Sequence, residues 1–173
     1  AATSVNINGG TLTLGASDRL DDSAAVTVGN AILDLVTFDD TVGSFTLNGG
    51  MLNGSGTLTA ATYTLNGGTV NANLGNGILT QLSNTTLLNG SSSASTVNII
   101  GGTLALGASD RLANGAAVTV TAATLDLGAF DDTVGTFTLN SGTLDGSGTL
   151  TASTYSLNGG TVNANLGSGT LTQ

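Results

Sequence analysis

The sequence predicts an all-β protein, a parallel β-helix or β-solenoid with about 18 residues per turn and about nine turns. Three observations lead to this fold: a long internal repeat, a shorter spacing of corner residues inside it, and alternation of apolar and polar residues. Composition agrees with it, because 27 glycines and an aromatic content of only 3% suit a thin coiled sheet.

Two near-copies of one unit make up almost the whole chain. Residues 1–81 align without a gap with residues 93–173, at a constant offset of 92, and most of the 81 pairs are identical. We therefore predict a first repeat unit at 1–92 and a second, truncated unit at 93–173. They are expected to form one continuous solenoid, since such units bury their apolar faces against their neighbours.

Asn and Gly segments divide each unit into turns. They recur every 17 to 20 residues, and five such steps fill the offset of 92. Both residue types accept the positive φ angles of tight corners, and Asn side chains stacked in register can form ladders along the axis. The predicted corner and ladder residues are Asn8, Gly9, Gly10, Asn48, Gly49, Gly50, Asn66, Gly67, Gly68, Gly101, Gly102, Asn158, Gly159 and Gly160. The corner is least clear at 83–98, SNTTLLNGSSSASTVN, which lacks a Gly-Gly pair.

Short strands with one buried face are predicted between these corners. In the first turn, VNINGGTLTL places apolar side chains at alternate positions on both sides of Gly9-Gly10. The inward positions that follow in the first unit are Val26 and Val28, Leu33 and Leu35, Phe45 and Leu47, Leu58 and Ala60, Tyr63 and Leu65, and Val70, Ala72 and Leu74. Alternation alone also fits a β-sandwich, and the corner spacing is what favours the solenoid.

The segment from Ala116 to Ala152 resembles the autotransporter-associated β-strand repeat. That repeat runs V-x-V, then T-L-D-L, then a Phe followed by T-V-G, then G-S-G-T-L. The corresponding pieces of the first unit are Val26 to Val28, Ile32 to Leu35, Phe38 to Gly43 and Gly54 to Leu58. The resemblance implies a secreted, right-handed parallel β-helix, similar to filamentous-haemagglutinin-like adhesins, with a role in surface display, attachment or a stalk.

Several classes of function are disfavoured by the residues that are missing. The chain contains no Cys, Pro, His, Trp or Lys, and its only cations are Arg19 and Arg111. Disulfides, Cys or His metal sites and Lys Schiff bases are therefore excluded. A net charge of -9 disfavours nucleic acid and anionic membrane surfaces as partners. Because no apolar run approaches about 20 residues, no membrane insertion is predicted. The start AATSV, without Met or a charged leader, suggests a mature or excised segment.

Two pairs of carboxylates are the main candidates for chemistry. Asp39-Asp40 and Asp131-Asp132 each precede a Thr-Val-Gly turn. Side by side they are candidate calcium ligands, but Ca²⁺ takes six to eight oxygens and further ligands are missing. We therefore expect solvated turn residues that hydrogen-bond local backbone amides. No cofactor site or enzyme activity is predicted, because Tyr63 and Tyr155, expected at the core boundary, have no catalytic partner.

The sequence therefore predicts a structural repeat segment of a secreted or cell-surface fibre or stalk, expected to be bacterial, that stacks end to end into a filament. Its expected partners are copies of itself or adjoining repeats. The alternative is an adhesin segment that binds a cell surface or glycan. Its binding patch would lie where the units differ, at 21–23, 29–32 and 36–37. Ice binding and polysaccharide cleavage are disfavoured, because the Thr-Leu-Thr motifs do not recur at every turn and only two Arg are present.

Overall fold

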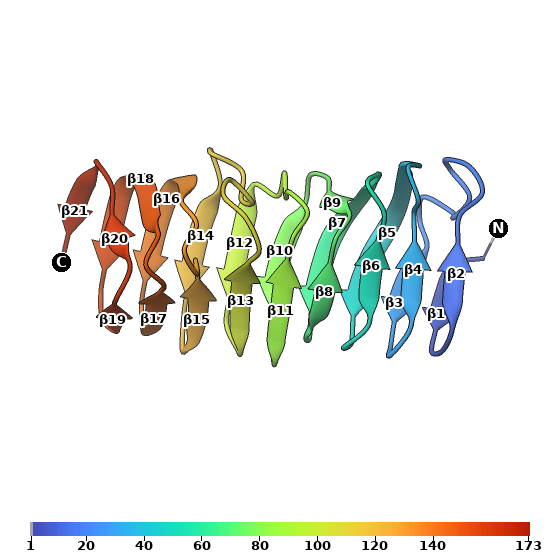
Figure 1. The fold of residues 1–173 in the computed structure, drawn as a ribbon, viewed down its shortest axis with the longest axis horizontal. Coiled ribbons are helices and arrows are strands. Elements are labelled where there is room, and N and C mark those ends of the chain that lie inside the picture. Colours follow the sequence, from blue (N-terminus) through green and yellow to red (C-terminus); the bar gives the residue numbers. More distant parts are fainter. Residues whose placement is uncertain (1) are drawn as a thin grey trace.

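The computed structural model describes residues 2–173, which form one β-solenoid of about nine turns (Figure 1). The strands lie side by side along one long axis, with the N-terminus at one end and the C-terminus at the other. All pairings between named strands are parallel, as the register from β1 (Ser4–Ile7) to β3 (Ala25–Val28) illustrates. The predicted fold class, turn length and number of turns are confirmed. None of residues 2–173 is helical, so this part of the chain has no helix that could cross a membrane.

Two sheets run the length of the solenoid. The first sheet contains β1 (Ser4–Ile7), β3 (Ala25–Val28), β5 (Asp40–Leu47), β7 (Thr57–Leu65), β9 (Asn73–Leu74), β10 (Ile78–Gln81), β12 (Thr96–Ile99), β14 (Ala117–Val120), β16 (Asp132–Leu139), β18 (Thr149–Leu157), β20 (Asn165–Leu166) and β21 (Thr170–Thr172). The second sheet contains β2 (Thr11–Thr13), β4 (Ile32–Asp34), β6 (Met51–Asn53), β8 (Gly68–Val70), β11 (Thr85–Leu88), β13 (Thr103–Leu106), β15 (Ala123–Asp126), β17 (Gly142–Asp145) and β19 (Thr161–Val162).

The register of the first sheet reproduces the sequence repeat. Paired residues along it are Ser4, Ala25, Ser44, Thr62, Ile78 and Thr96. The steps are therefore 21, 19, 18, 16 and 18 residues, and five turns advance the chain by the 92 residues of the sequence offset. The second unit repeats the first four of these steps from Thr96 to Thr170.

The second sheet advances by a different amount. Its paired residues are Thr11, Ile32, Met51, Thr69, Leu87 and Ala105, so five turns take 94 residues from Thr11 to Ala105. The residue equivalent to Thr11 in the second unit is Thr103, so the register has slipped by two residues. Because side chains alternate with a period of two, this slip leaves every side chain on its own face of the sheet.

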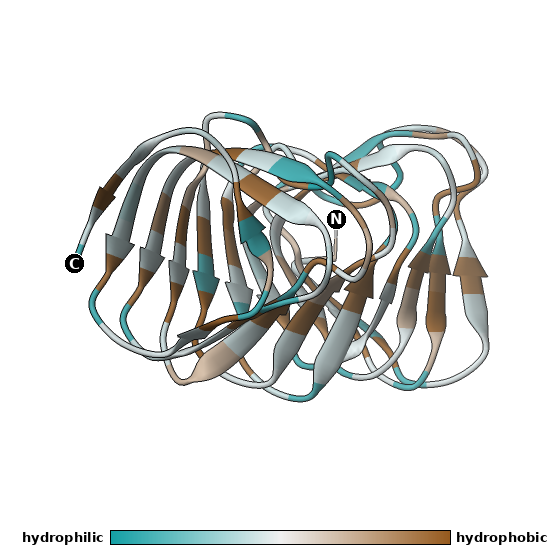
Figure 2. Ribbon diagram, turned by 60° about the vertical axis from the view of Figure 1, so that its left-hand side comes forward, coloured by the Kyte–Doolittle hydropathy of each residue, from teal (hydrophilic) through white to brown (hydrophobic). Residues whose placement is uncertain are grey.

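Apolar side chains fill the interior in columns parallel to the axis. Figure 2 shows hydrophobic bands on successive strands, with much of the hydrophilic colour in the connecting loops. In one column Val26, Phe45 and Tyr63 pair across β3, β5 and β7, and Phe45 and Tyr63 are fully buried. The predicted boundary position of Tyr63 is therefore wrong. The phenol is accommodated because its oxygen accepts the Ala60 amide at 2.8 Å and lies 3.0 Å from the Leu58 carbonyl oxygen. Tyr155 is buried in the same way.

The Asn-Gly-Gly segments lie where the chain leaves the first sheet for the second. At the corner between β7 and β8, Gly67 and Gly68 have φ angles of 99° and 109°. A Cβ at Gly68 would overlap the Gly50 carbonyl oxygen of the preceding turn. Glycine is needed here for its φ angle and for the close approach of two successive backbones.

The corner without a Gly-Gly pair forms by other means. Residues 82–84 connect β10 to β11, and Asn84 takes the left-handed conformation with φ of 53°. The Gln81 side chain points into the core, where its amide nitrogen donates to the carbonyls of Ser83 at 2.7 Å and Asn84 at 3.0 Å. A buried amide thus holds the corner, and both flanking strands keep their parallel pairing.

Val36 is strained, because a β-branched residue rarely adopts its φ of 58°. Gly128 occupies the equivalent position with φ of 59°, in the same turn capped by the preceding aspartate. We expect Val36→Gly to raise the free energy of unfolding by about 1 kcal/mol, since relief of strain exceeds the entropic cost of glycine. Gly128→Val should lower it by a similar amount. Urea denaturation measures both, and a destabilised Val36→Gly variant would contradict the expectation.

Candidate functional site

Asn side chains join successive turns outside the core. Asn66 donates its side-chain amide to the Asn48 Oδ1 at 2.8 Å, and Asn158 donates to Asn140 at 2.9 Å in the second unit. These contacts lie at the corner beside the Gly-Gly pairs. Asn8 lies at the first such corner, where its Oδ1 is near Gly29. The Asn–Asn contacts are therefore limited to one pair in each unit. Each pair is extended by one hydroxyl side chain, since Ser83 donates to Asn66 at 3.3 Å and Asn140 donates to Thr121 at 3.2 Å.

A second ladder, which was not predicted from the sequence, lies where the strands β6, β8 and β11 of the second sheet end. Asn71 donates to Asn53 at 3.1 Å, and Asn89 donates to Asn71 at 2.8 Å. In the second unit Asn163 donates to the Asp145 carboxylate at 2.9 Å. The signal was the 18-residue spacing of Asn53, Asn71 and Asn89, which equals the step between these turns. The side-chain hydrogen bonds of both ladders connect successive turns, so they run along the solenoid axis in the same direction as the backbone hydrogen bonds between strands.

The first member of each Asp pair caps the next turn. Asp39 Oδ1 accepts the Thr57 amide at 2.7 Å, and Asp131 Oδ1 accepts the Thr149 amide at 2.7 Å. Both aspartates are exposed, as expected for turn residues. The amides, however, belong to the following turn, 18 residues away, rather than to the local backbone. These carboxylates therefore connect turns.

The second member of each pair is buried, which corrects the expectation of a solvated residue. Asp40 and Asp132 are 2% and 1% exposed. Asp40 Oδ2 accepts the amides of Arg19 at 2.8 Å and Leu20 at 3.2 Å, and Asp132 holds Arg111 and Leu112 in the same way. Each carboxylate thus fixes the long loop of the preceding turn, and its other oxygen has no hydrogen-bond partner.

The arrangement offers little to a metal ion. Within residues 2–173 no three or more Asp, Glu, His or Cys side chains are grouped so that they could hold one. In each of the four candidate calcium ligands, at least one carboxylate oxygen instead accepts a hydrogen bond from a backbone amide. These carboxylates therefore connect successive turns through hydrogen bonds.

Both Arg side chains also bind backbone. Arg19 Nε donates to the Ser17 carbonyl and Arg111 Nε to the Ser109 carbonyl, each at 3.0 Å. Arg111 further donates an Nη1 hydrogen to the Asn89 carbonyl of the preceding turn at 2.7 Å. This last contact crosses from one repeat unit to the next.

Burial raises the pKa of Asp132 to about 6, and the nearby Asp110 charge adds to this, although the amides of Leu112 and Arg111 oppose it. Since this folded-state pKa lies above the ordinary value of 3.8, the folded chain binds the proton more tightly than the unfolded chain. We expect this group to make the free energy of unfolding about 1–3 kcal/mol higher near pH 4 than at pH 7, with the loss complete above about pH 6.

Asp132→Asn is the matched variant, because its side-chain oxygen can still accept both amides while the titration is removed. Denaturation at several pH values should show a smaller fall in stability between pH 4 and pH 7 for this variant. Parallel curves for the two proteins would contradict the prediction.

No family model, curated protein or solved structure matches the chain. The solenoid is a rod whose polar side chains mainly connect one turn to the next.

Proposed function

We propose that this chain is a structural repeat segment of a secreted or cell-surface fibre or stalk, in which further repeats continue the solenoid. One observation carries the proposal: the junction between the two units. There β10 pairs with β12 and β11 with β13, in the same parallel manner as strands inside a unit. A unit therefore presents at its end the register that the next unit needs, and such a stack can be extended by adding units.

The side chains support the same proposal. Backbone pairing, Asn ladders and aspartate caps all run along the axis, and the Asn66–Asn48 bond and the Asp39 cap each recur in the second unit, so each added unit would contribute a similar set of bonds. At the internal junction, Arg111 of the second unit bonds to Asn89 of the first. A repeat placed before β1 would offer Arg19 the equivalent carbonyl. The proposed location outside the cell is supported only by the resemblance of the sequence to secreted β-helix repeats.

A tandem protein tests the proposal. Two copies of the chain are joined by a repeat of residues 82–92, the last residues of the first unit, which lead into the second unit in the structure. The control joins them with a Gly-Ser linker of equal length. We expect the first protein to be one straight rod of roughly 90 Å, at about 4.8 Å per turn, and to unfold at a higher Tm than one copy. Electron cryo-microscopy and thermal unfolding measure both. Two hinged rods with the single-copy Tm would refute the proposal.

Assembly of separate copies is tested on the single chain. The carbonyls of Thr3, just before β1, and of Ile7 accept bonds from the next turn, so the amide of the intervening Asn6 faces the outer edge. If copies stack there, Asn6→Pro should abolish association in sedimentation experiments and Asn6→Ala should not. Association should be weaker than at the internal junction, because β19 would lack the partner that β11 provides to β8. Equal association of the Pro variant would exclude stacking at this edge.

A further inference from the structure

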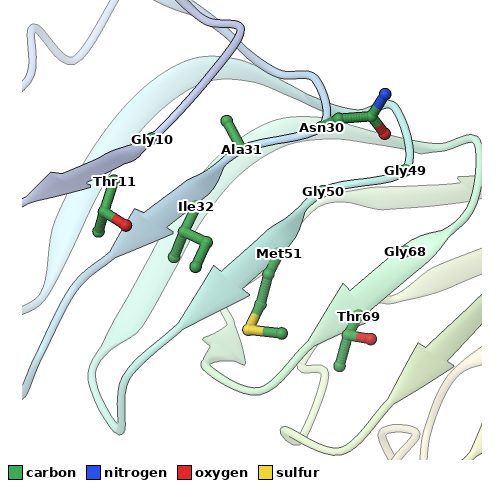
Figure 3. A pocket seen from close by; sticks show the side chains of 10 residues that line it. All are labelled: Gly10, Thr11, Asn30, Ala31, Ile32, Gly49, Gly50, Met51, Gly68 and Thr69. Atoms are coloured by element: carbon green, nitrogen blue, oxygen red, sulfur yellow. The ribbon is translucent and has the colours of Figure 1, made fainter.

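A groove of about 480 Å³ crosses the first four turns along the corner between the sheets (Figure 3). One row of its lining consists of outward side chains in register on β2, β4, β6 and β8, namely Thr11, Ile32, Met51 and Thr69. The residue before each of these lies beside the row, and three of these four neighbours are glycines. The groove therefore runs across the strands, parallel to the axis, for about 14 Å at the usual strand separation.

The middle of this row is apolar only in the first unit. Ile32 and Met51 are half-buried and face outward, and Thr124 and Thr143 occupy the equivalent positions of the second unit. The strands that carry them, β15 and β17, pair in the same manner as β4 and β6. The fold therefore accepts Thr at both positions, so the scaffold does not require an apolar side chain at either one, although the Asn71 side-chain nitrogen lies 3.6 Å from the Met51 Sδ. Two adjacent apolar side chains in an outward groove offer a surface against which apolar groups of a ligand can pack.

The ends and rim of the groove are polar and uncharged. Thr11 and Thr69 place hydroxyls at its two ends, and Asn30, which is Ala122 in the second unit, adds an exposed amide. None of the residues that line the groove carries a charge. The chain as a whole has a net charge of -9, which repels anionic ligands. The chemistry therefore favours a neutral ligand with both apolar and hydroxyl surfaces.

The backbone argues against an extended peptide. A peptide that binds by adding a strand needs an unpaired sheet edge. Here β4 is paired with β2 and β6 on its two sides, and β6 is paired with β4 and β8. We propose that the groove binds a neutral oligosaccharide along the solenoid axis, with its C–H surfaces on Ile32 and Met51 and its hydroxyls on Asn30, Thr11 and Thr69. This inference goes beyond the structural function and does not depend on it.

Met51 provides a specific probe, because it is the only methionine in the chain. Labelling with ¹³C-methyl methionine gives one NMR resonance inside the groove. The full chain is titrated with cellohexaose, maltohexaose and chitohexaose, and with a galacturonic acid hexamer and a neutral six-residue peptide as comparators. We expect a saturable shift with at least one neutral hexasaccharide, with Kd on the order of 1 mM, since no aromatic residue lines the groove. The two comparators should give no shift.

Two variants make the assignment specific. Asn30→Ala with Ile32→Thr keeps the Met51 probe and should weaken binding by about tenfold or more. Thr124→Ile with Thr143→Met transfers the apolar pair to the second unit, and the introduced methionine should give a second resonance that shifts with the same sugar. The proposal is overturned if no neutral hexasaccharide shifts the Met51 resonance, if the peptide or the acidic hexamer shifts it as strongly, or if the first variant binds as tightly as the natural chain.

Discussion

Gly56→Ala should lower the free energy of unfolding by about 3 kcal/mol, one of the largest effects of any single methyl group in this chain. Gly56 is buried where β7 approaches the preceding turn, and a Cβ placed there would overlap the Phe38 carbonyl oxygen. The obstacle is backbone, so it cannot rotate away as a side chain would. For a chain of this size, we expect Tm to fall by roughly 6 to 12 °C in thermal unfolding.

Gly9→Ala is the matched control for this substitution. Gly9 lies in the first corner, is exposed, and has no other group within 4 Å of the position that an alanine methyl would take. The Tm of this variant should stay within about 2 °C of the natural chain. A Gly56→Ala variant as stable as Gly9→Ala would show that the turns can move apart at no cost.

Phe45→Ala should cost about 3–5 kcal/mol. The ring is fully buried between Val26 and Tyr63 of the adjacent turns, so its removal leaves a cavity between two rigid hydrogen-bonded layers. Because parallel pairing fixes the spacing of the turns, we expect the cavity to collapse little. Urea denaturation should show the loss as a lower midpoint.

Thr46→Ala tests whether the loss of unfolding free energy depends on the face of the strand that the side chain occupies. Thr46 is the next residue along β5, and its side chain faces outward. Its removal should change the free energy of unfolding by less than about 1 kcal/mol. Similar losses at both positions would contradict the assignment of the two faces of β5.

The fold could be predicted because its signals are local and repeated. Alternation of apolar residues identifies the inward face of each strand, and Asn-Gly spacing gives the length of a turn. The register slip could not be predicted in this way, because it arises where β7 to β10 takes 16 residues while β8 to β11 takes 18. Such a difference between two faces of one turn is visible only when the partners of both strands are known.

The roles of individual polar residues were harder to predict, although some signals existed. Asp40 stands two positions before the inward Val42 on the same strand, so alternation alone would have placed it inside. Its partner amides, on Arg19 and Leu20, lie in a loop about 20 residues earlier and become neighbours only when the turns stack. The role of Gln81 was not predicted for a related reason. Its side chain lies in the core and donates to the carbonyls of Ser83 and Asn84, two and three residues further along the chain.

The two-residue slip of the second sheet decides how the surface of a longer rod would look. Thr11, Ile32, Met51 and Thr69 form one straight row, but the equivalent row of the second unit, which begins at Thr103, is offset along the strand by about 7 Å. Features of the second sheet that recur in every unit would therefore be displaced along the strand from one unit to the next, whereas those of the first sheet stay aligned. A long, straight polymer could follow the groove of one unit only, and would have to bend or be released before it reached the next.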